Sequence, residues 1–205
     1  VHDYFHAGWR WAQKAHDADS SAVYYLFMWN CLWRAGASLM HGHAQMLLGR
    51  HHHYGKVEAL RRHALAYRTQ TSRSYFDDLY AAHEALGLGF ERDGVRVMAH
   101  LTPLKEKETL LVADPFADNL PAKVHDVLAC FRDQLGVRSF NLALHQAPIG
   151  PVDEDWSDFP NVVRIVDRGD PHTQTSDMGT MELYAASVVA SDPFRVAEAL
   201  AQAVR

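Results

Sequence analysis

The pattern of hydrophobic and polar positions switches several times between a helical period and a strand period. Helices are predicted where apolar side chains recur at helical spacing or where helix formers dominate, at residues 2–16, 54–86, 120–135 and 193–204. A softer stretch at 69–72 leaves open whether the second of these is one helix or two. Strands are predicted where β-branched and aromatic residues cluster or alternate with polar ones, at residues 22–30, 39–48, 94–101, 108–113, 140–145, 162–166 and 181–189. This mixture indicates an α/β or α+β protein.

Length and composition place these elements in one compact unit. The chain has 205 residues, 48% of them hydrophobic, with no internal repeat and no Gly/Ser linker, so a single domain is expected. The formal net charge of -5 argues against nucleic acid as a partner, because a diffuse positive field is lacking. Two cysteines without a CxxC pair, and no apolar run of membrane-spanning length, favour a cytoplasmic protein that contacts no membrane.

The segment 35–45 carries the most informative chemistry, with the sequence Ala-Gly-Ala-Ser-Leu-Met-His-Gly-His-Ala-Gln. In a strand, the two-residue period would place His41, His43 and Gln45 side by side on one face. A neutral imidazole whose other ring nitrogen is fixed by a hydrogen bond can attack phosphorus, and an amide can hold phosphate oxygens. The small residues before the row, with the Ser38 hydroxyl, would let N–H and O–H groups approach a phosphate. The alternative is that these side chains merely decorate the exposed face of a half-buried strand.

This segment resembles the histidine-triad superfamily, specifically the galactose-1-phosphate uridylyltransferase branch, whose members carry Gly-x-Ser-x-x-His-Pro-His-x-Gln. Here the motif reads Gly36-Ala37-Ser38-Leu39-Met40-His41-Gly42-His43-Ala44-Gln45. Residues 27–30 upstream and residues 141–148 downstream are similar to the strands that flank the motif in the family. The resemblance implies an α+β fold for the single unit 1–205, an antiparallel sheet with helices packed on one side. It also implies two half-units, at about residues 1–92 and 93–205.

The resemblance assigns a role to each residue of the motif. His43, the second histidine, would attack the α-phosphate of a nucleotide sugar and form a covalent nucleotidyl-histidine. Gln45 would hold the non-bridging phosphate oxygens. Ser38 and the Gly36 backbone would contact the phosphates, and Asn30 would help to fix the loop and its histidine.

Other positions match the family less closely. His41 is expected to be structural or to face the substrate, and Glu182 and His145 are candidates for the acceptor side. Gly42 replaces the family's Pro between the two histidines, which loosens the backbone at His43. Val188 stands where the family has a glutamine that binds the sugar phosphate, which argues against galactose 1-phosphate as the acceptor.

The resemblance implies iron and zinc sites whose ligand sets are incomplete in this chain. Glu58 and His145 match two of the four iron ligands, but the second His-x-His falls on Pro160-Asn161-Val162. The zinc site of some members combines the first motif histidine, here His41, with two cysteines that have no counterparts. Because two ligands rarely hold a metal against water, we expect no stoichiometric iron or zinc.

These observations support three functions. The leading one is a nucleotidyltransferase that acts on a nucleoside diphosphate sugar or dinucleotide by a ping-pong route through His43. The second passes the adduct to water or inorganic phosphate, as a dinucleotide hydrolase or phosphorylase. The third is a nucleotide-binding relative without turnover, supported by Gly42, the missing His-x-His and Val188.

The expected partners are a nucleotide or nucleotide-sugar substrate and a second copy of the chain in a homodimer. The chain opens on Val1, and the family's nucleobase-binding segment would precede every residue matched here. The sequence therefore leaves open whether an upstream segment is missing.

Three further features favour structural interpretations. His51-His52-His53 is typical of a solvated turn, because adjacent residues point in different directions. Arg61 and Arg62 are expected to be solvated charges on a helix. Arg168-Gly169-Asp170 matches an adhesion tripeptide, which we interpret as a coincidence.

Overall fold

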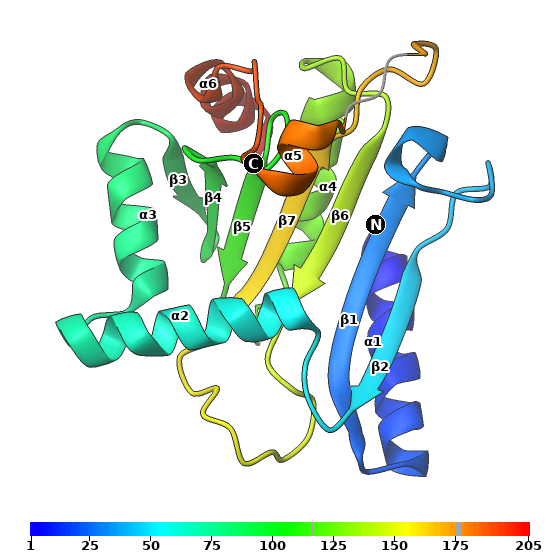
Figure 1. Ribbon diagram of the computed structural model, residues 1–205, viewed down its shortest axis with the longest axis vertical. Helices are drawn as coiled ribbons and strands as arrows, with labels where there is room; N and C mark the ends of the chain where they lie inside the picture. Colours follow the sequence, from blue (N-terminus) through cyan, green and yellow to red (C-terminus); the bar gives the residue numbers. More distant parts are fainter. Residues whose placement is uncertain (116, 175–177) are drawn as a thin grey trace.

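A computed structural model describes residues 1–115, 117–174 and 178–205 of the chain. Within these residues, one antiparallel sheet of seven strands has the order β2-β1-β6-β7-β5-β4-β3 (Figure 1). The strands are β1 (Ala22–Cys31), β2 (Gln45–Arg50), β3 (Gly89–Arg92), β4 (Val95–Ala99), β5 (Thr109–Ala113), β6 (Phe140–His145) and β7 (Asn161–Asp167). The predicted α+β class and antiparallel sheet are confirmed. The division into two half-units stays a prediction.

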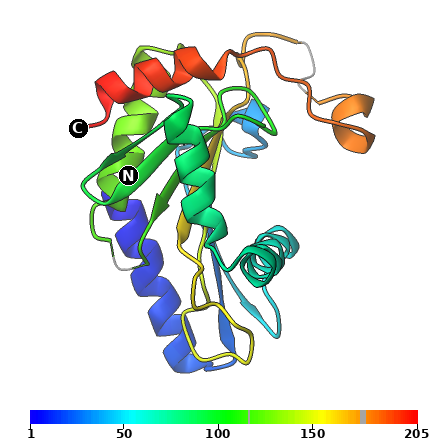
Figure 2. The same ribbon diagram turned by 90° about the vertical axis from the view of Figure 1, so that its left-hand side faces the viewer.

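Helices cover both faces of the sheet. They are α1 (His2–Ala18), α2 (Gly55–Thr71), α3 (Tyr75–Ala85), α4 (Leu120–Asp133), α5 (Thr180–Tyr184) and α6 (Pro193–Ala203), with a 3-10 turn, η1 (Trp33–Ala35). On one face, α1, α4 and α6 bury the main core, which includes Ala12, Phe27 and Leu200. On the other face, α2 and α3 bury a second cluster around Val57 and Phe76 (Figure 2). The expectation that the helices pack on one side is therefore wrong, because central strands such as β5 are apolar on both faces.

The largest difference from the sequence prediction lies before β2. The pattern predicts a strand at 39–48, whereas β2 begins at Gln45 and residues 36–44 form a loop. Gly36 ends η1 with a φ of 88°, in the left-handed region that glycine adopts without strain. Leu39 and Met40 are 63% and 71% exposed, so this stretch buries no apolar face. The alternation that indicates a strand therefore lies on a loop.

The predicted strand at 181–189 is also wrong. Residues 180–184 form α5, which has no buried residue, and residues 185–189 have no regular structure. A strand paired with β7 would need a free edge there, but β7 already lies between β6 and β5. The edges of the sheet are β2 and β3.

The remaining elements follow the pattern closely, except for β3. The predicted helix at 54–86 divides into α2 and α3 at the softer stretch, where Ser72 has a φ of 59° and Ser74 caps α3 by accepting from the Asp77 amide. Strand β3 is missed by the pattern, although Asp93-Gly94, with positive φ at both residues, is a strong hairpin signal. In the described part of the chain, every helix is too short or too polar to cross a membrane.

Candidate active site

The residues of the predicted motif gather at one end of the sheet, around the loop 36–44. This loop connects η1, after the end of β1, to the start of β2 (Figure 1). The two strands pair antiparallel, with Met28 opposite Gln45. His43 therefore lies two residues beyond the paired part of β2, and Asn30 lies two residues beyond Met28 along β1.

The ring of His43 is held by its own loop. Its Nδ1 lies 2.7 Å from the backbone oxygen of His41. Because a carbonyl oxygen only accepts hydrogen bonds, Nδ1 carries the proton, and the neutral ring then has its lone pair on Nε2. The side chain of His43 is half-buried. This arrangement meets the physical requirement for a nucleophilic imidazole even though the segment is not a strand.

Asn30 reaches the loop through a residue that the sequence analysis missed. Nδ2 of Asn141 donates to Oδ1 of Asn30 at 2.7 Å and lies 2.8 Å from the backbone oxygen of Ala35 in η1. Asn30 and Asn141 face each other in the register of β1 and β6. Arg168, just after β7, donates to Oδ1 of Asn141. These hydrogen bonds join the ends of β1 and β6 and the residue after β7 to the start of the loop. Arg168, the first residue of the adhesion-like tripeptide, therefore has a structural contact.

The other motif residues are arranged differently from the expected strand. Gln45 is the exposed first residue of β2, and Ser38 is exposed in the loop. The Gly36 amide donates to the Trp33 oxygen at 2.9 Å, inside the turn. A contact between this amide and a phosphate would have to replace that bond. The accessible Gln45 amide and Ser38 hydroxyl are therefore better placed for a ligand than the Gly36 backbone.

The two acceptor-side candidates lie in different places. His145 ends β6 four residues beyond Asn141, which is about 13 Å along the strand. Burial, with the nearby charge of Arg164, lowers the pKa of His145 to about 4, and its Nδ1 has no hydrogen-bond partner among the described residues. Glu182 is in α5, where its carboxylate accepts from the Gly179 amide at 2.9 Å. Figures 1 and 2 place α5, unlike the end of β6 that carries His145, at the same end of the sheet as η1.

Glu58 does not fit the iron site that the resemblance implies. Both carboxylate oxygens of Glu58 accept hydrogen bonds from the guanidinium of Arg61, each at 2.7 Å. One of them also accepts from the guanidinium of Arg62 at 2.6 Å. These bonds, above all those from Arg61, lower the pKa of Glu58 to about 2. In the described ranges, no group of three or more His, Cys, Asp or Glu side chains could hold a metal ion. A metal ion at Glu58 would have to displace the guanidinium groups of Arg61 and Arg62 from the carboxylate.

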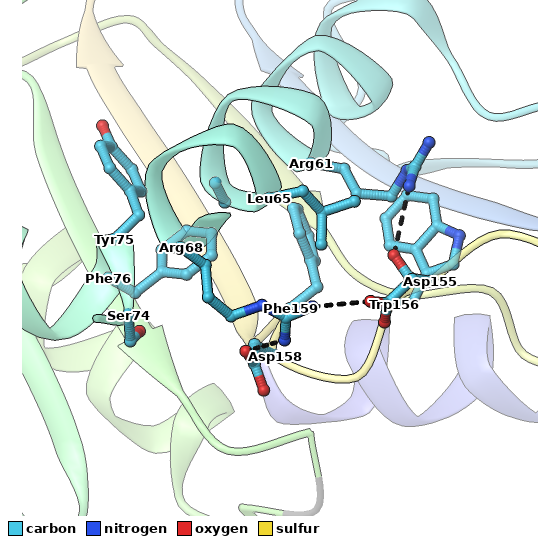
Figure 3. A pocket seen from close by; sticks show the side chains of 11 residues that line it. Arg61, Leu65, Arg68, Ser74, Tyr75, Phe76, Asp155, Trp156, Asp158 and Phe159 are labelled. Atoms are coloured by element: carbon cyan, nitrogen blue, oxygen red, sulfur yellow. Dashed lines mark hydrogen bonds and ion pairs between the residues drawn. The ribbon is translucent and has the colours of Figure 1, made fainter. Parts of the chain in front are cut away.

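Arg61 and His53 are buried, contrary to the solvated positions that the sequence predicts for them. Arg61 is 8% exposed, its guanidinium lies 5.2 Å from the ring centroid of Trp156, and Nη1 donates to the Asp155 backbone at 3.2 Å (Figure 3). His53 is 2% exposed, packs 5.3 Å from Trp156 and donates from Nε2 to the Gln146 backbone at 3.1 Å. Burial lowers its pKa to about 4.

These contacts join the start of α2 to the segment 146–156. We call Glu58, Arg61, His53 and Trp156 the α2 anchor. Sequence periodicity could not find it, because its partners are almost 100 residues apart in the chain.

Two cavities elsewhere in the described residues do not suit a nucleotide. The cavity beside Arg61 in Figure 3 has a volume of about 20 Å³, which is room for about one water molecule. A larger cavity of about 500 Å³ lies between α3 and the ends of β4 and β5. Its lining includes one guanidinium, that of Arg96, and four carboxylates, so negative groups outnumber positive ones; the carboxylates are those of Asp77, Glu91, Asp114 and Asp158. Neither cavity contains a residue of the predicted motif.

No family model and no curated protein matches the chain. Among solved structures, a uridylyltransferase superposes with a TM-score of 0.76 at 16% identity, over 94% of this chain and 64% of that one. The chain has the uridylyltransferase fold. A GalT-like protein from Arabidopsis thaliana has a TM-score of 0.76 at 18% identity, over 99% of this chain and 68% of that one. An ADP-glucose phosphorylase from Arabidopsis thaliana has a TM-score of 0.70 at 18% identity, over 93% and 62%.

The resemblance drawn from the motif is thereby confirmed for the fold. The chain spans 64% of the length of the uridylyltransferase that it matches. At identities of 16–18% the similarity concerns the fold, so the reaction has to be argued from the residues of the site.

Proposed function

We propose that the chain catalyses nucleotidyl transfer through a covalent nucleotidyl-histidine on His43. The observation that carries this proposal is the hydrogen bond between His43 Nδ1 and the His41 carbonyl. It leaves Nε2 free to attack, and it stabilises the positive charge that the ring gains as the new bond forms. Solved structures of this fold include a uridylyltransferase and an ADP-glucose phosphorylase with bound ADP-glucose, which supports a nucleoside diphosphate sugar as the donor.

The proposed reaction has two half-reactions. In the first, Nε2 of His43 attacks the α-phosphorus, a P–N bond forms, and the bond to the bridging oxygen breaks so that the sugar phosphate leaves with the electron pair. The Nδ1 proton stays on the ring, held by His41. In the second, an acceptor oxygen attacks the phosphorus and the electron pair of the P–N bond returns to Nε2. Positioning and fixed dipoles supply most of the catalysis in such transfers, and we assign these roles to Gln45, Ser38 and Asn30.

The acceptor distinguishes the leading function from the second candidate. A phosphorylase has the same fold, which favours inorganic phosphate as an acceptor beside a sugar phosphate. The adducted protein, freed of donor, is therefore to be mixed separately with a hexose 1-phosphate, inorganic phosphate and buffer alone. The acceptor that discharges the adduct fastest defines the reaction.

The decisive experiment is intact-protein mass spectrometry after incubation with nucleotide sugars and dinucleotides. We expect the mass to rise by one nucleotidyl group that is lost in acid, as is typical of a phosphorus–nitrogen bond. His43→Asn should abolish this adduct and leave thermal unfolding unchanged, because the side chain is only half-buried. His63→Asn, at an exposed position of α2, is the matched control and should form the adduct normally.

An adduct that survives in His43→Asn would refute the assignment of the nucleophile. If the unmodified protein binds nucleotide but forms no adduct with any donor, the relative without turnover is the correct alternative.

A further inference from the structure

The loop that carries His43 is tied to the rest of the fold at very few points. Apart from the β1–β2 ladder, the hydrogen bonds of the described residues join the segment 38–44 to other parts of the chain at one place. There the Tyr4 hydroxyl donates to the Gly42 backbone oxygen at 3.3 Å. The bond between His43 Nδ1 and His41 is internal to the segment. The Gly42 carbonyl belongs to the peptide bond that leads into His43, so Tyr4 contacts the backbone immediately before the proposed nucleophile.

Tyr4 is 37% exposed, and an aromatic contact positions its ring. Its ring packs edge-on against Trp29 at 5.2 Å between centroids, and Trp29 packs in the same way against Phe140 at 5.2 Å. These two rings belong to β1 and β6, beside the paired Asn30 and Asn141. The hydroxyl of Tyr4 is therefore positioned by the same strand ends that hold the start of the loop.

Gly42 is the loop position at which a hydrogen bond restricts the backbone most. Glycine has more backbone freedom than any other residue, and this freedom lies next to His43. The fold does not require glycine here, because its φ is outside the left-handed region and an added Cβ would meet no atom within 4 Å. The backbone freedom at Gly42 can therefore be reduced by adding a Cβ, which meets no neighbouring atom.

We propose that Tyr4 is a positioning residue, whose hydroxyl fixes the Gly42 peptide and so directs Nε2 of His43. The effect on rate rests on the proposed function, whereas the effect on loop order does not. The two parts are measured separately.

Tyr4→Phe tests this, since it keeps the aromatic ring and removes only the hydroxyl. We expect single-turnover adduct formation to slow about threefold to tenfold, the range that one hydrogen bond supports. We also expect NMR order parameters of the backbone at residues 41–44 to fall, with a weaker signature of the Nδ1–H tautomer of His43. Tyr67→Phe is the matched control, because its hydroxyl bonds to Asp78 between α2 and α3 at 2.7 Å; it should change neither readout.

Rescue separates positioning from a general loss of structure. Gly42→Pro limits the backbone at the same peptide, and Gly42→Ala does so more weakly. Placed in the Tyr4→Phe background, either should return the order parameters and the rate toward the wild-type values. The proposal is overturned if Tyr4→Phe leaves the loop as ordered as before, or if neither second substitution restores order. If the wild-type protein forms no adduct with any donor, the proposed function fails, while the order parameters still decide the role of Tyr4.

Discussion

The loop 36–44 and the α2 anchor each hold a histidine by hydrogen bonds, but they do so in opposite ways. In the anchor, both oxygens of Glu58 and both ring nitrogens of His53 are engaged, and burial favours the neutral form of that ring. In the loop, one nitrogen of His43 is engaged by a carbonyl and the other is left for chemistry. Saturated, buried polar groups hold a fold together. An imidazole with one nitrogen held by a hydrogen bond and the other nitrogen free can react.

This comparison separates the expected effects of substitutions. Changes in the loop and at the start of β2 should alter the rate of adduct formation and leave stability almost unchanged, because the side chains there are exposed or half-buried. Changes in the α2 anchor should do the reverse.

After the loss of the adduct in His43→Asn, the largest expected effect is at Gln45. Gln45→Ala should slow single-turnover adduct formation by about 10² to 10³, the usual loss when one fixed dipole is removed from a developing charge. Ser38→Ala should cost less, because other donors near the phosphate remain. Stability should hardly change, since Gln45 is an exposed residue of an edge strand.

Leu47→Ala is the control for Gln45, because Leu47 is also exposed and lies two residues further along β2. It should leave the rate unchanged. A Gln45→Ala protein that forms the adduct at the wild-type rate would show that this amide does not contact the phosphate.

Local periodicity accounts for the parts of the fold that could be predicted. Strand β6 alternates buried and less buried side chains, and α4 buries Val124, Val127 and Phe131 on one face, so the pattern alone locates both elements. The loop 36–44 could not be located in this way, because its alternation comes from exposed polar residues. The distinction between loop and strand depends on η1 and on the left-handed Gly36.

The site could be predicted only where its residues lie close together in the sequence. His41 and His43 are two residues apart, so the motif itself identifies both, although the strand prediction does not anticipate the bond from the His43 ring to the His41 carbonyl. Asn141 joins the site through the register of β1 and β6, and Arg61 becomes buried only when Trp156 packs against α2. These placements follow from tertiary contacts that a single sequence does not show.

The second prediction concerns Arg61. Arg61→Gln should lower the free energy of unfolding by about 3 kcal/mol, because Glu58 would stay mostly buried without its main partner. Urea unfolding measures the loss, and adduct formation at 25 °C should be unaffected. Arg62→Gln is the matched control: Arg62 pairs with the same carboxylate, but its side chain is 73% exposed, so it should cost less than about 1 kcal/mol.

The same measurements test the mismatch with the iron site. Because guanidinium groups already engage Glu58, a chelator should leave the unfolding curve of the wild-type protein unchanged. Equal losses in Arg61→Gln and Arg62→Gln, or a stoichiometric metal that is released together with stability, would show that a cation other than Arg61 holds this carboxylate.

The smallest predicted effect is a pH dependence from His53. Burial keeps the pKa of His53 at about 4 in the folded protein, against 6.5 for an ordinary histidine. At pH values between 4 and 6.5, the unfolded chain therefore binds a proton at this residue and the folded protein does not. The free energy of unfolding is therefore unaffected by this group above pH 6.5, and it decreases as the pH falls toward 4. Between pH 7 and pH 5 the loss is about 2 kcal/mol, with a similar contribution from His145.

His53→Phe should therefore reduce the difference in unfolding free energy between pH 7 and pH 5 by about 2 kcal/mol, while lowering stability at both because two hydrogen bonds are lost. The remaining difference belongs to other buried histidines, among them His145 and His83, whose pKa values burial also lowers. His52→Phe, at the exposed neighbouring position, should leave the difference as it is in the wild type. If His53→Phe also retains the full difference, then His53 is solvated in the folded protein and the contrast between the α2 anchor and the loop does not hold at this residue.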